Sequence, residues 1–387
     1  MSWTLAMVNA FYHPYIGGSE KHMYELSQRL ARKHEVVVIT SRLEDTPEYE
    51  ELNNVKIHRL DARLLKLPHI YPPPYPLCKE VYPAMEQLNR KYGFDFINIH
   101  GRWFRDFNRA IYFGKKNGIK TVLTLHNGKP TGIDPLTSLL GLTYDSIRGK
   151  KLLRSVDRII SVSEAVKREM GGYGIDTGKI TPIHNGVDTS VFRRTKPKFR
   201  DEYPQFDKIV LYLGRMIEQK GLPYLLDAAE RIHEKDDSVG FLMVGKGEKK
   251  EQLMKTVRKR GMEKYVIFPG FIEEKDLPAL YSSADLYVLP SLWEVLPISL
   301  LEALSVGLPL VSTDAGGNAE IVKDGINGYV VGKRDPRALE ERIENLLADE
   351  EKRDEMGRKS REIALNEFDW DIIAERTERF YTEWHEA

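Results

Sequence analysis

Short apolar segments alternate with longer amphipathic segments along most of the chain. Each apolar segment is typical of a buried strand, and the amphipathic segments between most of them are typical of helices. This alternation predicts α/β architecture, with parallel sheets covered by helices on both faces. The expected strands are 5–9, 36–40, 96–100, 121–125, 158–162, 209–213, 241–244, 266–268, 286–289, 310–313 and 329–331.

The alternation is interrupted near 181–192, which predicts a domain boundary. Asn185, Gly186 and Asp188 form turns readily, and the segment that follows is charged and contains proline. Two doubly wound domains of similar size are therefore expected, 1–190 and 191–368, with a cleft between them. The last stretch, 369–387, places four large apolar residues at helical spacing: Trp370, Ile373, Phe380 and Trp384.

Composition favours a globular protein of a reducing compartment. The chain has 387 residues, of which 41% are hydrophobic, so it is long enough for two cores. A single cysteine, Cys78, excludes an internal disulfide framework and a multi-cysteine metal site. The sequence shows no apolar run of about 18 residues and no signal peptide at its N-terminus. We therefore expect a cytoplasmic protein.

Charge is unevenly distributed, although the formal net charge is zero. Residues 101–160 carry 12 Lys/Arg and 4 Asp/Glu, an excess of 8 positive charges. This segment predicts an anionic partner, either phosphate groups or a lipid surface at the inner face of the membrane. A solvated basic face is an equally weighted alternative, and no nucleic-acid partner is expected.

The stretch 290–317, PSLWEVLPISLLEALSVGLPLVSTDAGG, has the outline of a binding site. Glu294 lies in a loop between two prolines, and Glu302 lies on the helix that begins near Ile298. Proline is tolerated at a helix start but not in its interior. The unpaired N–H groups and the positive dipole end of this helix favour an anion or a polyol in the loop.

Two further loops of the second half carry residues suited to phosphate. Arg215 and Lys220 follow the strand 209–213 and precede a helix, a combination that fits a diphosphate. Gly245 begins a Gly-x-Gly turn after the next strand, and the ring of Phe271 would flank a flat base. Each feature alone has a plain structural alternative, an exposed charge or a tight turn.

The first half offers polar groups at expected strand ends. His100 and His126 each end an apolar strand, and Arg102 follows closely, at the edge where parallel sheets bind ligands. Gly17 and Gly18 leave the backbone bare before a helix that Ser19 is expected to cap. Neither histidine has the spacing of a metal-ligand pair. Structural roles for these residues are the alternative.

The segment 67–83 contains six prolines and three tyrosines, so no regular helix is expected there. A loop packed on its own domain is slightly favoured over one that lines an acceptor pocket. The sequence shows no nucleophile elbow, no Walker motif and no Cys/His cluster. Hydrolase, ATPase and metalloenzyme interpretations therefore lose their usual support.

Taken in order, these motifs resemble the retaining family-4 glycosyltransferases of GT-B architecture, also called group 1. The resemblance covers essentially the whole chain. Its most specific part is the pair of glutamates together with the GR and KG residues. The motifs are GGSE at 17–20, HNGVD at 184–188, GR at 214–215, KG at 220–221, Glu294 with Glu302, AGGNAEIV at 315–322 and NGYVV at 327–331.

The resemblance implies two Rossmann-like domains facing a central cleft, with the C-terminal helix, 369–387, crossing back to the first domain. It implies transfer of a hexosyl group, mannosyl or glucosyl, from a nucleotide-sugar donor to an acceptor glycan, polyol or lipid-linked sugar. No metal or cofactor is expected. Membrane contact through the basic first domain is an additional expectation.

The family's site residues carry over onto matching positions. Arg215 and Lys220 would bind the diphosphate, Glu294 the donor sugar and Glu302 the ribose. His126 would lie near the reactive face of the sugar. The same resemblance implies donor contacts for Gly17, Gly18, Gly245, Phe271, Leu296, Pro297 and Ile298, and an acceptor side with His100, Arg102 and His126.

Val295 departs from the family pattern, because glycine is common after the first glutamate. A Cβ there disfavours positive φ, so the pocket is expected to differ in shape. A sugar-nucleotide epimerase of the same build and a non-catalytic nucleotide-sugar binding protein are the alternative functions. A glycan phosphorylase would need a pyridoxal phosphate lysine, for which the sequence offers no context.

Overall fold

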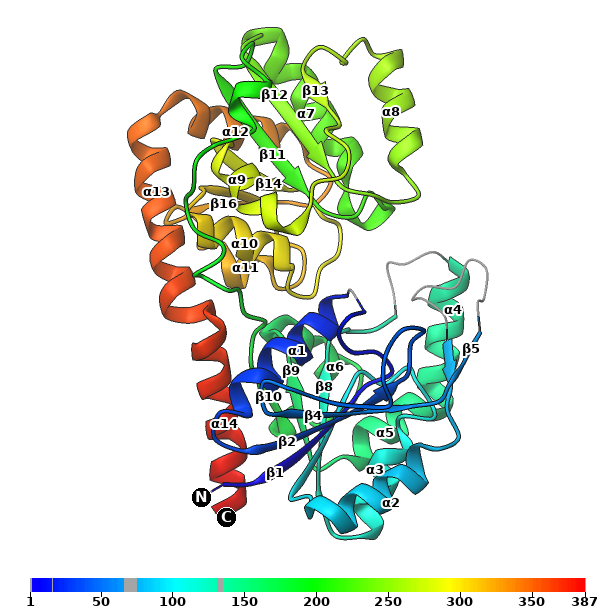
Figure 1. The fold of residues 1–387 in the computed structure, drawn as a ribbon. Helices are drawn as coiled ribbons and strands as arrows, with labels where there is room; N and C mark the ends of the chain where they lie inside the picture. Colours follow the sequence, from blue (N-terminus) through cyan, green and yellow to red (C-terminus); the bar gives the residue numbers. More distant parts are fainter. Residues whose placement is uncertain (1, 16, 66–74, 131–134, 387) are drawn as a thin grey trace. The chain divides into compact units, whose positions relative to one another are not determined.

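A computed structural model describes residues 2–15, 17–65, 75–130 and 135–386 of the chain. The chain divides into two compact units (Figure 1). The first unit contains Met1–Asn185 and Trp370–Ala387, and the second contains Gly186–Asp369. The expected boundaries after 190 and 368 compare with boundaries after 185 and 369 in the structure.

The first unit is built on an eight-stranded sheet in the order β10-β9-β8-β7-β1-β2-β4-β3. All neighbouring strands are parallel except β3 and β4. The strands are β1 (Thr4–Val8), β2 (Glu35–Ser41), β3 (Tyr49–Leu52), β4 (Val55–Leu60), β7 (Phe96–His100), β8 (Lys120–Leu125), β9 (Arg158–Ser161) and β10 (Ile180–Pro182).

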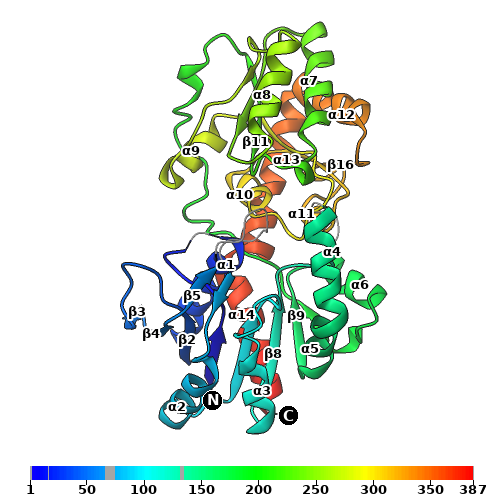
Figure 2. The ribbon, with the colours of Figure 1, turned by 90° about the vertical axis from the view of Figure 1, so that its right-hand side faces the viewer.

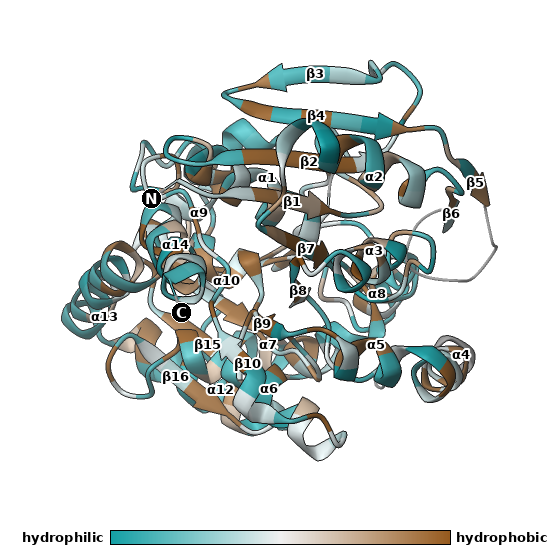
Figure 3. Cartoon of the chain, turned by 90° about the horizontal axis from the view of Figure 1, so that it is seen from below, coloured by the Kyte–Doolittle hydropathy of each residue, from teal (hydrophilic) through white to brown (hydrophobic). Residues whose placement is uncertain are grey.

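The antiparallel edge corrects the expectation of an all-parallel sheet. Asn53 and Asn54 connect β3 to β4, and both have positive φ, 51° and 66°. This backbone matches the twist of a two-residue hairpin, and asparagine tolerates it better than most residues. In Figure 3 the central strands β1 and β7 are mostly hydrophobic, whereas β3 is mostly hydrophilic. The half-exposed strand β3 lacks the apolar run used to predict β1, β2, β7, β8 and β9.

Helices and helical turns connect the strands of this sheet. They are α1 (Gly18–Leu30), α2 (Val81–Tyr92), α3 (Arg109–Lys116), α4 (Pro135–Tyr144), the π-helical turn η1 (Asp145–Gly149), α5 (Lys150–Ser155), α6 (Glu164–Gly172) and the 3-10 turn η2 (Thr177–Lys179). A short hairpin, β5 (Arg63–Leu65) with β6 (Tyr75–Leu77), lies apart from the main sheet.

Two expectations for these helices are wrong. Helix α1 begins at Gly18 with extended Gly17 as its N-cap, so Ser19 lies inside the first turn and does not cap it. In the proline-rich segment, residues 75–77 form β6 and residues 81–83 form the first turn of α2. Pro83 fits there because the N–H groups of a first turn need no intrahelical partner. Residues 67–74 lie outside the described residues.

The C-terminal helix α14 (Trp370–Glu386) belongs to the first unit. Its Trp370, Ile373 and Tyr381 are buried in one core with Trp3 and Phe96. The hydroxyl of Tyr381 also receives a hydrogen bond from the amide of Asn98 in β7, at 2.9 Å. The expected amphipathic helix is therefore packed against the sheet that begins the chain, as the family resemblance implied.

The second unit is built on a six-stranded parallel sheet in the order β13-β12-β11-β14-β15-β16. Its strands are β11 (Lys208–Leu213), β12 (Val239–Val244), β13 (Val266–Ile267), β14 (Leu286–Leu289), β15 (Leu310–Thr313) and β16 (Gly328–Val331). Each overlaps an expected strand, because parallel strands covered by helices read as short apolar runs.

Helices and single turns connect these strands. They are η3 (Arg200–Glu202), η4 (Glu218–Lys220), α7 (Leu222–Lys235), α8 (Lys250–Lys259), η5 (Glu274–Asp276), α9 (Leu277–Ser282), α10 (Ile298–Val306), α11 (Asn318–Ile321), α12 (Pro336–Ala348), α13 (Glu350–Ile363) and η6 (Ala364–Phe368). Among the described residues, no helix has both the length and the apolar character needed to cross a bilayer.

Candidate functional site

The candidate site of the second unit lies where the strand order of its parallel sheet reverses. Strands β11 and β14 are neighbours at the middle of the sheet, and the chain builds outward from each of them. In open parallel sheets, ligands bind at the carboxyl ends of the two strands that flank this reversal. The loops that leave β11 and β14 carry Arg215, Lys220 and Glu294, and α10 carries Glu302.

Glycines allow the site loops to touch. Gly221 has φ of +61°, and a Cβ built on it would lie 2.1 Å from the carbonyl oxygen of Pro290. Gly316 has φ of +54°, and its Cβ would lie 1.8 Å from the carbonyl oxygen of Glu294. Both distances are too short for real carbon atoms, so only glycine fits. The loops after β11, β14 and β15 therefore form one closely packed surface.

Lys220 and Glu294 pair directly within this surface. The Lys220 ammonium donates to the Glu294 carboxylate over 2.5 Å, and the Ser291 hydroxyl donates to the same oxygen over 2.6 Å. The two side chains are 11% and 10% exposed. The family resemblance implied separate partners for these groups, the diphosphate for Lys220 and the donor sugar for Glu294. In the structure each neutralises the charge of the other.

Arg215 is exposed on the same loop as Lys220. The hydroxyl of Tyr212 donates to the backbone carbonyl of Arg215 over 2.8 Å and so holds this part of the loop in place. The amide of Gly214 donates to Val244 in the neighbouring strand over 3.0 Å. A guanidinium on a fixed backbone is suited to a phosphate ligand.

Glu302 is 5% exposed and lies on α10. The buried hydroxyl of Tyr281 donates to one of its carboxylate oxygens over 2.9 Å. Burial, with the charge of Glu302 nearby, keeps the pKa of Tyr281 well above its ordinary value, so the phenol stays protonated. The Glu302 carboxylate is thus held in one orientation.

The start of α10 matches the expected helix. Pro297 is its N-cap and Ile298 its first residue, while Leu296 is buried beneath the loop. The first amides of a helix lack carbonyl partners within it, so they point toward the loop. Val295 is not among the described non-glycine residues with positive φ, which are Asp45, Asn53, Asn54 and Arg334. This backbone therefore accommodates the Cβ without left-handed strain.

Gly245 and Phe271 lie on the loops after β12 and β13. A Cβ on Gly245 would lie 1.9 Å from the carbonyl oxygen of Gly214, so this turn packs against the Arg215 loop. Phe271 is 70% exposed, and the ammonium of Lys246 lies 4.3 Å from the centre of its ring. An exposed ring beside a cation is a suitable surface for stacking a base.

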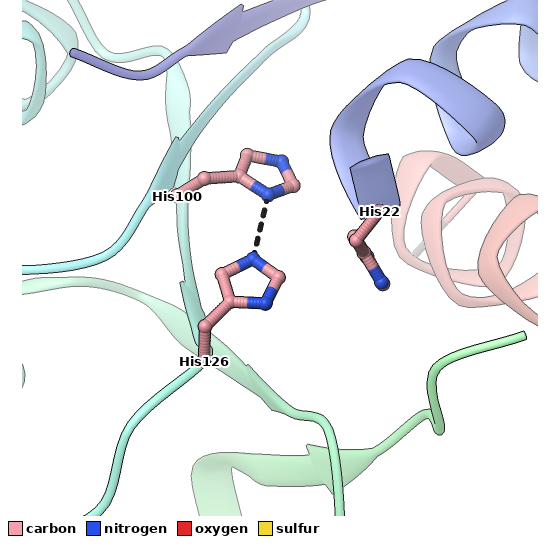
Figure 4. Close-up of side chains that lie close together, drawn as sticks. All are labelled: His22, His100 and His126. Atoms are coloured by element: carbon pink, nitrogen blue, oxygen red, sulfur yellow. Dashed lines mark hydrogen bonds between the residues drawn. The ribbon is translucent and has the colours of Figure 1, made fainter. Parts of the chain in front are cut away.

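In the first unit, three histidines meet at the carboxyl ends of neighbouring strands (Figure 4). His100 ends β7 and His126 directly follows β8, and their Nδ1 and Nε2 atoms lie 3.1 Å apart. His22 approaches from α1, and its Nδ1 lies 3.0 Å from the amide oxygen of Asn185. The sequence placed His100 and His126 at strand ends correctly but missed His22.

Burial keeps this cluster uncharged. It lowers the pKa of His22 to about 4 and those of His100 and His126 well below the ordinary value. One potential ligand atom from each ring lies within 4.8 Å of the others. Neutral imidazoles at such distances are able to share hydrogen bonds or to bind a transition-metal cation. The expectation of a metal-free protein stays a prediction.

Arg102 differs from its expected role on the acceptor side. Its guanidinium is 1% exposed and forms a two-pronged ion pair with the buried carboxylate of Asp145, at 2.9 and 3.0 Å. It also donates to the carbonyls of Asn127 and Gly128. All its donor atoms are thus engaged within the unit. Arg102 holds the backbone beside His126 and presents no open charge.

Gly17 and Gly18 lie at the start of α1, as its N-cap and its first residue, and a buried carboxylate lies beside them. A Cβ on Gly17 would lie 2.1 Å from Oε2 of Glu20, which is 8% exposed. Burial raises the pKa of Glu20. Neither Glu20 nor His22 is among the predicted site residues. Glu20 is the last residue of the GGSE motif and lies in the first turn of α1, whereas His22 is signalled only by its position one turn after Gly18.

Two family models together match most of the chain. The model for "Glycosyltransferase Family 4" matches residues 16–191, and the model for "Glycosyl transferases group 1" matches residues 194–363. The first match contains the histidine cluster and the second contains the four charged residues of the β11 and β14 loops and α10.

Among similar proteins, an uncharacterized glycosyltransferase of Methanocaldococcus jannaschii is 29% identical, over 97% of each chain. A Saccharomyces cerevisiae phosphatidylinositol N-acetylglucosaminyltransferase GPI3 subunit is 26% identical, over 85% of this chain and 72% of its own. A GDP-mannose-dependent phosphatidylinositol monomannoside mannosyltransferase of Mycolicibacterium smegmatis is 24% identical, over 95% of each.

Solved structures resemble the whole chain. Sucrose-phosphate synthase of Thermosynechococcus elongatus has a TM-score of 0.78 at 21% identity, over 99% of both chains. HepE of Anabaena, in complex with UDP-glucose, has a TM-score of 0.74 at 19% identity, over 98% of this chain and 99% of its own. At these identities the likeness demonstrates a shared fold.

Proposed function

Because the chain belongs to the family-4, group 1 glycosyltransferases and has the GT-B fold, we propose that it is a retaining hexosyltransferase that needs no metal. In the proposed reaction, the bond between the anomeric carbon and the diphosphate of a nucleotide-sugar breaks. A bond to an acceptor oxygen forms with the same anomeric configuration. The nucleoside diphosphate leaves, and the acceptor hydroxyl loses its proton.

The observation that carries this proposal is the group of charged residues near the carboxyl ends of β11 and β14, where the strand order of the second unit reverses. Arg215 and Lys220 lie on the loop after β11, where they would bind the diphosphate and stabilise its growing charge. Preorganised positive charge on the leaving group is the contribution that a metal ion makes in other enzymes.

The carboxylates of this group have separate proposed partners. Glu294 is assigned to hydroxyls of the donor sugar and Glu302 to those of the ribose. Glu302 is already oriented by Tyr281, which suits a group that recognises rather than reacts. Glu294 has to exchange its ion pair with Lys220 for contacts to the donor. Gly245, Phe271 and the start of α10 would complete the donor pocket.

His126 is the proposed contribution of the first unit near the reacting carbon. Its Nε2 is engaged with His100, so the ring is held in a defined orientation. His100 is thereby a positioning residue for His126. Gly17 and Gly18 would bring bare backbone toward the phosphate or the acceptor.

Two kinds of donor are compatible with the comparisons. The relative of M. smegmatis is named for GDP-mannose, and the HepE structure contains UDP-glucose. We propose a mannosyl or glucosyl donor on this basis. Two relatives are named for phosphatidylinositol-based acceptors. With the excess of positive charge in 101–160, this supports a lipid-linked or phosphorylated acceptor.

A donor panel tests the proposal. Release of nucleoside diphosphate from GDP-mannose, UDP-glucose and ADP-glucose should be measured with and without candidate acceptors, in the presence of EDTA. Acceptor-dependent release, with an α-linked product by NMR from an α-linked donor, is expected. Acceptor-independent release with a changed sugar would identify an epimerase. Donor binding without turnover by any acceptor would favour a non-catalytic binding protein.

A further inference from the structure

A continuous helical segment of the first unit exposes apolar side chains to solvent. It consists of α4, η1 and α5, which follow each other without a break from 135 to 155 (Figure 2). Leu139 is 62%, Leu140 46% and Ile147 68% exposed. These are three of the ten large hydrophobic residues that are exposed in the described part of the chain. Their concentration within nine positions marks this surface as unusual.

All charged side chains that this segment exposes to solvent are basic. Arg148, Lys151 and Arg154 are exposed, and Lys150 is half-buried. Asp145 is the sole acidic residue between 135 and 155, and its carboxylate is fully buried against Arg102. Apolar side chains beside basic ones, without acidic neighbours on the segment, are typical of surfaces that meet anionic lipid.

The opposite side of the segment is firmly attached to its unit. The hydroxyl of Tyr144 donates to the carbonyl of Arg102 over 2.8 Å, and the hydroxyl of Tyr173 donates to Asp145 over 3.2 Å. The ring of Trp103 packs against Tyr144 with centres 5.6 Å apart. These contacts account for the burial of Asp145 and Arg102. The exposed leucines and isoleucine are therefore presented by a fixed scaffold.

We propose that α4, η1 and α5 form a docking surface for a bilayer that contains anionic lipids. Leu139, Leu140 and Ile147 enter the interface between headgroups and acyl chains, while Arg148, Lys151 and Arg154 face lipid phosphates. The role of this surface rests on the proposed function, because an enzyme that uses a lipid-linked acceptor has to bind that acceptor at a membrane. Lipid binding itself requires neither donor nor acceptor.

A vesicle experiment tests the surface on the full chain. Cosedimentation is measured with vesicles of phosphatidylcholine alone and of equal parts phosphatidylcholine and phosphatidylglycerol. We expect binding to the mixed vesicles, weaker binding to phosphatidylcholine alone, and loss of binding as NaCl is raised. Equal binding to both vesicles, or no binding at low salt, would overturn the proposal.

Two sets of variants locate the binding. Leu139→Ser with Ile147→Ser removes apolar contacts, and Arg148→Glu with Lys151→Glu reverses two charges. Each pair should weaken binding to the mixed vesicles by roughly tenfold or more. Matched controls on the second unit are Val191→Ser with Ile326→Ser, and Arg258→Glu with Lys259→Glu, all at exposed positions. Equal losses in controls and test variants would contradict this location.

Misfolding and self-association are tested as separate causes of weaker vesicle binding. Thermal unfolding confirms that each variant is folded. Sedimentation equilibrium shows whether a second copy of the chain binds to this surface. A dimer that dissociates in the Leu139→Ser, Ile147→Ser variant would overturn the lipid assignment. Turnover with a water-soluble acceptor should be unchanged in the variants. If the chain binds vesicles but transfers no glycosyl group, the proposed function is wrong and the docking surface stands. If it transfers a glycosyl group but does not bind vesicles, only the docking surface is wrong.

Discussion

The ammonium of Lys220 lies 2.5 Å from a carboxylate oxygen of Glu294, although 74 positions separate the two residues in sequence. Both side chains are nearly buried, so each compensates a charge that would otherwise be costly to remove from water. In the proposed reaction, these two groups bind opposite ends of the bond that breaks. Donor binding therefore has to replace an existing ion pair.

Replacing Lys220 with Ala should lower kcat by roughly 10²–10³-fold, because the leaving diphosphate loses a preorganised charge. Steady-state release of nucleoside diphosphate provides the measurement. Lys220→Arg keeps the charge but not the geometry of the ammonium and should retain an intermediate rate.

Folding of these variants has to be checked, since the alanine variant removes the cation beside Glu294 and leaves its carboxylate with the Ser291 hydroxyl. Circular dichroism and thermal unfolding serve as controls. A folded Lys220→Ala protein with near-normal kcat would refute the role of Lys220 in the reaction.

Gly221 tests whether close packing of the loops is required. Gly221→Ala should lower the free energy of unfolding by more than the roughly 1–2 kcal/mol expected for a left-handed alanine. It should also weaken donor binding, because the new Cβ would lie 2.1 Å from the carbonyl oxygen of Pro290.

Gly261→Ala is a matched control for this substitution. Gly261 has nearly the same φ, +67° against +61°, but a Cβ at this position would have no described neighbour within 4 Å. Urea denaturation and donor titration compare the two. Equal destabilisation by both substitutions would mean that the loops separate readily to make room.

Tyr281→Phe tests the orientation of Glu302. The variant removes the hydroxyl that donates to this carboxylate and keeps the buried ring. Hydrogen bonds to charged groups contribute about 1.5–3 kcal/mol, so KM for the donor should rise roughly tenfold or more while kcat changes less. Tyr265→Phe, just before β13, is the control and should leave KM unchanged. A normal KM in Tyr281→Phe would show that Glu302 does not depend on this phenol.

The buried histidines predict a loss of stability in mild acid. Burial lowers the pKa of His22 to about 4 in the folded protein, whereas an unfolded histidine titrates near 6.5. Between these values the unfolded chain binds a proton that the folded chain does not. Stability is therefore complete above pH 6.5 and falls as the pH approaches 4, by roughly 3 kcal/mol for this residue.

Urea denaturation at pH 7 and pH 5 measures this dependence. His22→Gln should reduce the difference between the two conditions, while His100 and His126 continue to contribute in the same direction. His58, whose pKa burial and nearby lysines lower to about 4, contributes likewise and stays in the variant. An unchanged difference in His22→Gln would show that this imidazole is charged or solvated in the folded protein.

The sequence by itself determined the central strands, the start of α10 and the loops on which the site residues lie. These features depend on near neighbours: an apolar run predicts a buried strand, and Pro297 with Ile298 predicts a helix start. The positions of His100 and His126 at strand ends followed in the same way. The edge strand β3 and its neighbour β4 escaped prediction because partly exposed positions interrupt their apolar pattern.

Only the tertiary structure decided which groups distant in sequence form ion pairs or hydrogen bonds with each other. It paired Lys220 with Glu294, buried Arg102 against Asp145 and brought His22 from α1 to the ends of β7 and β8. These outcomes depend on which side chains lose water together when strands and helices pack. A sequence pattern records what each residue is able to do, whereas packing selects the partner with which it does so.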